Sequence, residues 1–310
     1  MTPTVAICIA THNRRDDLTR TLREIARLDP PPAEIIIATD GCTDGTPEFI
    51  VKEYPAARII THVEARGSIP SRNEMAAVCA TDVFLSLDDD SYPIETDFIP
   101  RVARMFAENP ALAIASFPQR SDEFPATLTQ TDFGPPHFTG TYANSGAAIR
   151  RRVFAALGGY PDFFRHAYEE PDFALRCCAA GWQVRHETSL TIRHHFTSAM
   201  RNEMRTHHRH ARNELWSVLL RCPAPQLFGV ALFRLIRQAG YARSRGLSWL
   251  LREPPWWAAC LAGMPRCLAS REPLPWRKYR AWMGLVRTPI QSRDEWSAKF
   301  GAPIKGAPPC

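Results

Sequence analysis

Residues 83–90 read Val-Phe-Leu-Ser-Leu-Asp-Asp-Asp, a short and mostly apolar run that is followed at once by three adjacent carboxylates. Such a run is typical of a buried strand. Three neighbouring carboxylates repel one another, so a fold buries them only where a cation compensates their charge. Mg²⁺ and Mn²⁺ prefer oxygen ligands and commonly share the phosphates of a substrate. The stretch therefore predicts a strand that ends at a divalent-metal site, with a solvated acidic turn as the alternative.

Short apolar runs alternate with amphipathic segments throughout the first ninety residues. The expected strands lie at 4–10, 34–38, 58–62 and 83–87, and the expected helices at 16–28, 46–54 and 67–80. Strands separated by helices of about a dozen residues form βαβ units, which assemble into a mostly parallel sheet with helices on both faces. Polar residues that directly follow such strands face the ligand crevice at the carboxyl edge of the sheet. They lie here at 11–14, 39–45, 62–72 and 88–90.

The chain after residue 90 is less regular. Residues 116–142 contain several prolines and glycines and predict a long connection with little regular structure. A strand is expected at 144–149, a short helix at 152–157 and a longer helix at 171–180. Beyond residue 199 the pattern changes to arginine-rich helices interrupted by prolines.

Charge divides the chain into two unlike parts. Residues 1–200 carry 19 Lys and Arg against 26 Asp and Glu, whereas residues 201–310 carry 19 against 6. Seven of the eight tryptophans also follow residue 200. The modest overall charge of +6 is therefore the sum of an acidic body and a basic tail.

Composition excludes several classes of protein. An apolar content of 45% with 23% charged residues rules out a disordered or collagen-like chain. The nine cysteines are odd in number and form no CxxC pair, and the start of the chain lacks the features of a signal peptide. These features favour reduced thiols in a cytoplasmic protein. No apolar run reaches the roughly 18–20 residues that a membrane-spanning helix needs.

Six motifs carry a resemblance to a known family. In chain order they are TVAICIATHNRRDDLTRTL (4–22), IIIATDGCTDGT (35–46), GSIPSRNEMA (67–76), FLSLDDDSYP (84–93), GTYANSGAAIRRRVFAALGGY (140–160) and HAYEEPDFALR (166–176). Each is common alone, but in this order they resemble the successive motifs of family 2 glycosyltransferases with the GT-A fold. The resemblance implies an α/β fold of GT-A type, with a mostly parallel central sheet flanked by helices.

The same resemblance implies a division of the chain into domains. A catalytic domain would span residues 1–200, with a Rossmann-like nucleotide-binding half at 1–90 and an acceptor half at 91–200. Residues 201–310 would form a basic, Trp-rich, helical C-terminal extension.

The function implied by the resemblance is that of an inverting glycosyltransferase. Such an enzyme would move a sugar from a nucleotide diphosphate sugar, a UDP- or dTDP-sugar, to an acceptor hydroxyl in polysaccharide or glycolipid assembly. The expected partners are this donor and a saccharide or lipid-linked acceptor, and the expected cofactor is a divalent metal, Mn²⁺ or Mg²⁺. Thr39 and Cys42 stand where an acidic residue and a serine are common in the family, which leaves the base open.

The resemblance assigns seven residues to the nucleotide-sugar site: Thr11, Asn13, Arg14, Asp40, Arg72, Asp88 and Asp89. Asp40 would bind the base, Arg72 the base or the diphosphate, and Asp88 the ribose. The chemistry agrees, because arginine forms charge-assisted hydrogen bonds to phosphate and carboxylates accept hydrogen bonds from amides and hydroxyls.

Three further residues complete the expected substrate and metal contacts. Asp90 would hold the metal ion. Asn144 and Gly146 would lie beside the acceptor or donor sugar, where a glycine lets the backbone approach closely.

A second group of acids, Glu169 and Glu170, precedes the predicted helix at 171–180. An inverting transfer needs a base that takes the proton of the acceptor hydroxyl, and a carboxylate within hydrogen-bond reach can serve. The base of the family corresponds to Glu170, where glutamate replaces aspartate, and Glu169 is the alternate candidate. The competing interpretation is that these acids only favour the helix start, because the helix dipole attracts negative charge there.

His194 and His195 follow a strand-like stretch where members of the family often place a metal ligand. Their side chains point to opposite faces of an extended backbone, so only one can enter the site. We favour His194 as the metal ligand. His207, His208 and His210 belong to a basic segment, and we interpret it as a solvated or phosphate-facing helix because no acid or cysteine completes a metal-ligand set.

Other classes of function stay open at this point. A nucleotidyltransferase would share the nucleotide-binding sheet and the metal-binding acids, but it would release pyrophosphate and would not need the glutamate pair. A non-catalytic relative that only binds nucleotide sugars is a further alternative, because Glu170 replaces an aspartate. Binding of nucleic acid is not expected, since the basic tail lacks the signature of a DNA- or RNA-binding motif.

The basic tail has two interpretations. Basic amphipathic helices with tryptophans suit an anionic membrane surface, which would bring the site to a lipid-linked acceptor. The protein would then lie peripherally on the inner face of the cell membrane. In the other interpretation, the helices pack on the catalytic domain, with their tryptophans in its core and their arginines paired with its acids.

Overall fold

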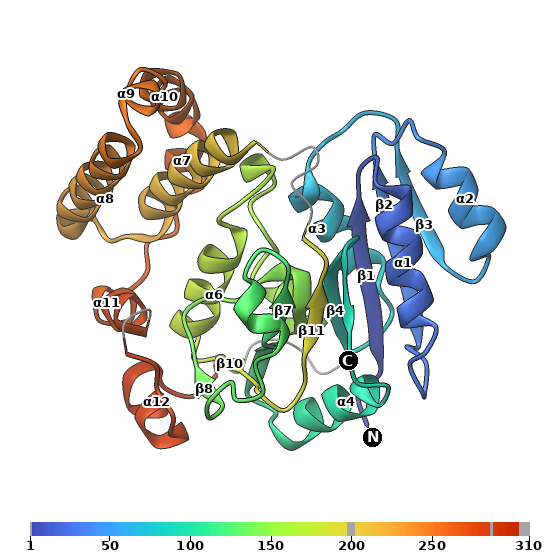
Figure 1. The fold of residues 1–310 in the computed structure, drawn as a ribbon. Helices are drawn as coiled ribbons and strands as arrows, with labels where there is room; N and C mark the ends of the chain where they lie inside the picture. Colours follow the sequence, from blue (N-terminus) through green and yellow to red (C-terminus); the bar gives the residue numbers. More distant parts are fainter. Residues whose placement is uncertain (1, 197–201, 286–287, 304–310) are drawn as a thin grey trace.

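The computed structural model describes residues 2–196, 202–285 and 288–303, and at its centre lies a sheet of eight strands (Figure 1). The strands follow one another in space in the order β3, β2, β1, β4, β9, β6, β10, β8. Their bounds are β1 Val5–Thr11, β2 Glu34–Asp40, β3 Arg58–His62, β4 Val83–Asp88, β6 Leu112–Ser116, β8 His137–Phe138, β9 Ala147–Arg150 and β10 Gln183–His186.

The sheet is mostly parallel, as the sequence predicts. Strands β1 to β4 run parallel to one another, and β6 runs parallel to β10. Strand β9 is antiparallel to both β4 and β6, and β8 is antiparallel to β10. Two antiparallel insertions therefore interrupt an α/β sheet whose first four strands all end at the same edge.

Strand β1 has a buried side chain on each face because two cores enclose the sheet. Ile7 and Ile9 belong to the core shared with helices α1 and α4, whereas Ala6 and Cys8 belong to the core shared with α3, α5 and α6. The helices of this body are α1 Arg15–Ile25, α2 Thr46–Glu53, α3 Ser68–Val78, α4 Phe98–Glu108, α5 Arg151–Ala156 and α6 Glu169–Ala179. A nearly continuous apolar run is what a strand covered on both faces requires.

A second, three-stranded sheet begins where β4 ends. Its strands are β5 Ser91–Pro93, β7 Gln119–Ser121 and β11 Ile192–His194. Strand β11 pairs antiparallel with β5, so that His194 lies opposite Ser91. This pairing brings the histidine next to the acidic stretch, although the two are far apart in the sequence.

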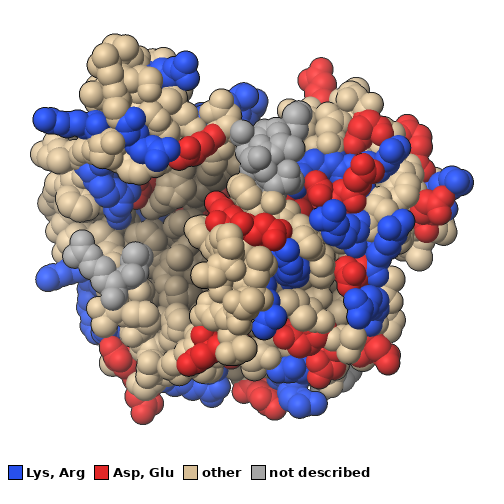
Figure 2. Space-filling view, in the orientation of Figure 1, with Lys and Arg blue, Asp and Glu red and all other residues tan. Residues whose placement is uncertain are grey.

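Helices account for most of the described residues after 202, as the sequence predicts. They are α7 Glu203–Arg221, α8 Ala224–Arg245, α9 Leu247–Leu250, α10 Glu253–Ala269, α11 Trp276–Leu285 and α12 Arg293–Phe300. Helix α11 packs against α6, where Lys278 Nζ donates to the carbonyl oxygen of Ala179 at 2.5 Å. Helices α8 to α10 form a separate lobe beside the sheet (Figure 1), and the basic side chains on its surface (Figure 2) are all arginines.

Tryptophans of this C-terminal part are largely interior. Five of them are buried: Trp216, Trp249, Trp256, Trp282 and Trp296. The indole Nε1 of Trp282 donates to the carbonyl oxygen of Gly140 at 2.7 Å, and the ring of Trp296 lies 5.0 Å from that of Phe138. The packing interpretation of the tail therefore holds for Trp282 and Trp296, whereas Trp249 and Trp256 contact His207 and Glu253 of the tail itself.

Three local details differ from the sequence prediction. Residues 144–146 form a 3₁₀ turn, and strand β9 begins only at Ala147. Helix α6 begins at Glu169, so the two glutamates lie in its first turn and not before it. The long connection at 116–142 is mostly irregular but contains the short strands β7 and β8.

Two further observations concern the chemistry of the chain. All eight cysteines among the described residues are free. Within the same residues, no helix combines the length and apolar character that are needed to cross a membrane.

Candidate active site

Two aspartates and a histidine meet at the carboxyl end of β4. Ligand atoms of Asp88, Asp90 and His194 all lie within 4.8 Å of one another. His194 Nε2 is 3.2 Å from Asp90 Oδ1. Two carboxylates and an imidazole form a donor set that suits a divalent ion such as Mn²⁺ or Mg²⁺. The sequence suggested Asp90 and His194 as metal ligands, and the structure adds Asp88 as a third candidate.

The choice between the two histidines follows from the strand register. His195 turns to the other side of β11, where its Nε2 is 2.8 Å from the hydroxyl of Tyr92 and its Nδ1 is 3.4 Å from Asp122 Oδ2. Only His194 therefore belongs to the group of potential metal ligands.

Asp89 is buried just after the end of β4. It accepts hydrogen bonds from Thr11 Oγ1 at 2.8 Å and from Arg14 Nη1 at 2.6 Å. Burial raises the pKa of Asp89 to about 7. Arg14 also donates from Nη2 to Asp90 Oδ2 at 2.5 Å. The sequence assigns Thr11, Arg14 and Asp89 to the nucleotide-sugar site. In the structure they form one network that supports the metal-ligand group. Their contact with a nucleotide stays a prediction.

Burial acts to raise the pKa of Asp90, but its hydrogen bonds with His194 and Arg14 outweigh this effect and lower the pKa. Asp90 is therefore an anion at neutral pH. An ionised carboxylate is the form that binds a metal ion.

Arg72 joins the metal-ligand group to the glutamate pair. It is buried in α3, donates to the hydroxyl of Ser86 and forms an ion pair with Asp88. Burial acts to lower the pKa of Arg72, but the charges of Asp88, Glu169 and Glu170 raise it. The guanidinium of Arg72 is therefore near carboxylates of both the metal-ligand group and the glutamate pair.

Asp40, the last residue of β2, holds the loop that leads into α3. Its Oδ1 accepts from the backbone N–H of Arg66 and its Oδ2 from that of Gly67, both at 2.8 Å. Gly67 has φ +104°, and a Cβ there would lie 2.4 Å from the carbonyl oxygen of Arg165. Both carboxylate oxygens therefore have a structural task, and a contact between Asp40 and a base stays a prediction.

Asn13 and Asp44 shape the loops after β1 and β2. Asn13 adopts a left-handed conformation with φ 53°, and its Oδ1 accepts from the backbone N–H of Thr43 at 2.7 Å. Asp44 Oδ1 accepts from Thr46 Oγ1 at 2.6 Å at the start of α2. Asp44 is thus a residue of the turn that leads into α2.

The glutamate pair lies in the first turn of α6 and contacts Asn144. Glu169 is only 4% exposed, and its Oε1 accepts from Asn144 Nδ2 at 3.2 Å. Glu170 is half-buried, and its Oε1 accepts from the backbone N–H of Asn144 at 3.4 Å. Burial raises the pKa of both carboxyl groups, and the charge of Glu169 raises that of Glu170 further. A raised pKa is typical of a carboxylate that acts as a general base.

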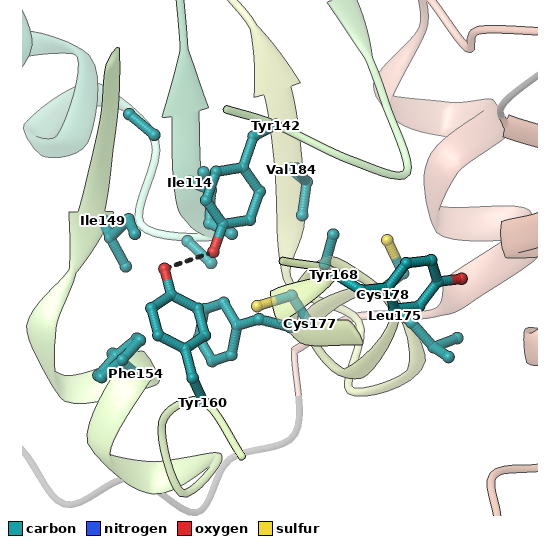
Figure 3. Close-up of a cluster of buried hydrophobic side chains, with 14 of the residues drawn as sticks. Ile114, Tyr142, Ile149, Phe154, Tyr160, Tyr168, Leu175, Cys177, Cys178 and Val184 are labelled. Atoms are coloured by element: carbon teal, nitrogen blue, oxygen red, sulfur yellow. Dashed lines mark hydrogen bonds between the residues drawn. The ribbon is translucent and has the colours of Figure 1, made fainter. Parts of the chain in front are cut away.

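Two tyrosines hold Asn144 in place. Tyr160 donates from its hydroxyl to Asn144 Oδ1 at 2.8 Å, and its oxygen is 2.7 Å from the hydroxyl of Tyr142. Figure 3 shows these two hydroxyls facing each other within a cluster of apolar side chains. Asn144 therefore joins this buried network to the glutamate pair, while its contact with a sugar stays a prediction.

Gly146 has a packing reason to be glycine. A Cβ at this position would lie 2.6 Å from Cγ1 of Ile192 in β11. The space that the missing side chain leaves is thus filled by the small sheet that carries His194. A role of Gly146 beside a sugar stays a prediction.

The segment before the glutamate pair adopts an unfavourable backbone conformation. Arg165, Ala167 and Tyr168 have φ values of 60°, 72° and 68°, although none of them is glycine. Each such conformation costs on the order of 1 kcal/mol or more, and it persists only where the surroundings enforce it. The position of the pair therefore depends on contacts outside α6.

Helix α7 supplies these contacts through Asn213, whose side chain is fully buried. Its Nδ2 donates to the carbonyl oxygens of Phe164, His166 and Ala167 at 3.1, 2.9 and 2.8 Å. Sequence reasoning missed Asn213, because its partners are in a loop some 46 to 49 residues earlier in the chain.

Asp172 reinforces the same junction between α6 and α7. Its Oδ2 accepts from Arg176 at 2.9 Å, and its Oδ1 accepts from Ser217 Oγ at 2.8 Å. Asn213, Ser217 and Arg221 recur every four residues and so share one face of α7. This polar stripe among the apolar residues of the second half of α7 was the available signal in the sequence.

Two family models match the chain. The model for glycosyl transferase family 2 matches residues 6–158, and the model for glycosyl transferase family group 2 matches residues 83–287. The chain belongs to the family 2 glycosyltransferases. Among curated proteins, none matches the sequence of the chain.

Solved glycosyltransferase structures share the fold. The mannosyltransferase PcManGT from Pyrobaculum calidifontis, in complex with GDP-Man and Mn²⁺, is 18% identical with a TM-score of 0.57, over 92% of this chain and 84% of that one. Residues 1–349 of S. aureus TarS, in complex with UDP, are 13% identical with a TM-score of 0.61, over 96% and 89%. GalNAc-T7 with UDP, GalNAc and Mn²⁺ is 14% identical with a TM-score of 0.55, over 71% and 49%. At these identities the likeness establishes the GT-A fold alone.

Proposed function

We propose that the protein is an inverting, metal-dependent glycosyltransferase, which transfers a sugar from a nucleoside diphosphate sugar to an acceptor hydroxyl. One observation carries this proposal. The buried Arg72 forms an ion pair with Asp88 of the metal-ligand group and is also close enough to the glutamate pair of α6 to feel its charge. An inverting transfer needs these two functions near one another: stabilisation of the leaving group and removal of the acceptor's proton.

The leaving-group side of the site is built from Asp88, Asp90 and His194. These residues would hold the cation, which when bound would neutralise charge on the departing nucleoside diphosphate. Arg72 supplies a further fixed positive charge, and it is preorganised because Ser86 and Asp88 hold its guanidinium. A UDP- or dTDP-sugar is the proposed donor. Similar structures with UDP or GDP-Man support a nucleotide sugar as the ligand.

Glu170 is the better candidate for the general base. Glu170 is half-buried and can reach an acceptor, whereas Glu169 is enclosed and bonded to the side chain of Asn144. Deprotonated Glu170 would take the proton of the acceptor hydroxyl as that oxygen attacks the anomeric carbon. Glu169 would keep the pair and Asn144 in position.

The location of the enzyme is proposed from an exposed apolar stripe on α8. Phe228, Leu232 and Ile236 recur every four residues and are 78%, 58% and 63% exposed. Leu247 and Leu251, in and just after α9, are each 70% exposed. Large exposed apolar patches mark interaction sites. Beside the many arginines of this lobe, the stripe fits an anionic membrane surface, where a saccharide or lipid-linked acceptor would be found in polysaccharide or glycolipid assembly.

An assay of the purified chain tests the proposed reaction. Nucleoside diphosphate sugars are screened for hydrolysis with and without Mn²⁺, and the released nucleotide is identified. Glu170→Gln and Asp90→Ala should each abolish turnover, whereas Glu108→Gln, at the exposed end of α4, should leave it unchanged. Release of pyrophosphate from a nucleoside triphosphate supplied with a sugar 1-phosphate would instead support a nucleotidyltransferase, and full activity of either site variant would refute the assignment of that residue.

A further inference from the structure

A basic hollow lies between α7 and α10, beside the loop that precedes the glutamate pair. Its volume is about 360 Å³. The lining includes four arginines, one histidine and one tryptophan: Arg205, Arg209, Arg212, Arg252, His208 and Trp256. The lining contains no acidic side chain. A hollow with this lining is chemically suited to an anion.

The arginines of α7 form a row along one side of the hollow. Arg205, Arg209 and Arg212 are spaced by four and three residues, so they share one face of the helix. The row is about 10 Å long, at 1.5 Å per helical residue. In the described part of the chain, none of the three forms an ion pair with an acidic side chain. Burial lowers the pKa of Arg209, and the charges of Arg205 and Arg165 lower it further. The row is thus a local excess of positive charge that the protein itself does not compensate.

The acid next to the lining residues is already bonded within the protein. Glu253 is buried, and its carboxylate accepts from the indole Nε1 of Trp256 at 2.9 Å. Its other oxygen is 3.2 Å from His208 Nε2 and accepts from Gln238 Nε2 at 3.2 Å. Because this acid is turned inward and already bonded, it leaves the arginines free to bind a ligand from the solvent side.

The hollow adjoins the proposed acceptor side of the active site. Arg212 Nη2 donates to the carbonyl oxygen of Phe164 at 3.3 Å, at the start of the loop that leads to Glu169. Two residues further on, His166 feels the charges of both Arg209 and Glu170. The arginine row therefore contacts the loop that leads to the proposed base.

We propose that this hollow binds a phosphate or diphosphate group of the acceptor. The inference rests on the proposed transfer reaction, because it names the class of acceptor: a molecule whose hydroxyl reaches Glu170 while its anionic group pairs with Arg205 and Arg209. Guanidinium groups bind phosphate through charge-assisted, often bidentate hydrogen bonds. The wall formed by Trp256 would cover an apolar portion next to that group.

Binding of soluble probes tests the site separately from catalysis. Inorganic pyrophosphate and octyl phosphate are titrated calorimetrically into the full chain in EDTA, so that the metal-ligand group does not contribute. Arg205→Gln combined with Arg209→Gln should weaken both probes by about a hundredfold, since one hydrogen bond to a charged group is worth roughly tenfold in affinity. Arg243→Gln, at an exposed position of α8, serves as the matched control and should bind like the wild type.

Two further measurements separate the outcomes. The double variant should melt at the wild-type temperature and hydrolyse the donor at the wild-type rate, because Arg205 and Arg209 lie outside the donor site. Equal probe binding by wild type and double variant would overturn the proposal. Binding of phosphatidylglycerol vesicles without any binding of the soluble probes would also overturn it, because the arginines would then serve a membrane surface. Probe binding that depends on the arginines in a chain that hydrolyses no nucleotide sugar would support the anion site but refute the proposed reaction.

Discussion

Replacement of Asn213 by alanine tests whether α7 positions the glutamate pair. The wild-type side chain donates to three carbonyl oxygens of the loop 164–167, and it is fully buried. The amide nitrogen has two hydrogens, which the three oxygens share, so a net contribution of about 1 kcal/mol for each N–H predicts a loss of roughly 2 kcal/mol in the free energy of unfolding. For a chain of this length, we expect the melting temperature to fall by roughly 4 °C, at the lower end of the usual 2–4 °C per kcal/mol.

Activity should fall by more than this loss of stability explains. Without Asn213, the residues with positive φ can relax, and Glu169 and Glu170 would shift with the loop. A displacement of about 1 Å at a reacting group can cost on the order of a hundredfold in rate. We therefore expect kcat to fall between tenfold and a hundredfold, on the order of that cost. The affinity for the nucleoside diphosphate should stay unchanged, because the residues of the metal-ligand group belong to other elements.

Asn109→Ala is the matched control for stability. Asn109 is also buried, and its Nδ2 donates to Gln183 Oε1 at 2.7 Å. It precedes β6 and so lies at the amino ends of the strands, whereas the site lies at their carboxyl ends. This variant should lose stability and keep the wild-type kcat. Steady-state kinetics below the melting transition, with thermal unfolding followed by circular dichroism, provide both readouts. The reasoning is refuted if Asn213→Ala loses no more activity than Asn109→Ala.

Four further predictions concern the site and the surface. Because burial raises the pKa of Glu170, the transfer rate should fall with decreasing pH well above the ordinary glutamate pKa of about 4.3, and a flat pH profile down to that value would contradict its role as the base. Asp90→Ala should lose Mn²⁺ binding in a calorimetric titration, and wild-type affinity would exclude Asp90 as a ligand. Gly146→Ala places a Cβ 2.6 Å from Ile192, so overpacking should cost about 1–3 kcal/mol and lower the melting temperature, and an unchanged melting temperature would contradict this packing. Phe228→Ser with Ile236→Ser should reduce cosedimentation with phosphatidylglycerol vesicles at an unchanged melting temperature, and equal cosedimentation would refute the membrane proposal.

Much of the nucleotide-binding half could be predicted from sequence because its signals are local. The apolar runs of β1 to β4 and the polar residues after them recur at the spacing of βαβ units, and the resulting sheet has the predicted order of strands and helices. The contact between Asp44 and Thr46 is likewise local, since the two residues are only two positions apart. The start of α6 was predicted two residues late. Proline is common in the first turn of a helix, so the sequence predicts a start at Pro171, whereas the helix already begins at Glu169.

The sequence by itself determined which residue types are available to the site and at which edge of the sheet they stand. Periodicity places Asp88 to Asp90 at the end of a strand, and the order of the motifs identifies the family. Only the tertiary structure decided how these side chains are used. It bonded Asp89 to Thr11, brought His194 to Asp90 through the pairing of β11 with β5, and placed Asn213 of the basic tail against the loop that precedes the glutamate pair. The physical reason is that a buried polar group needs a partner, and these partners come from segments far apart in the chain, which no local pattern joins.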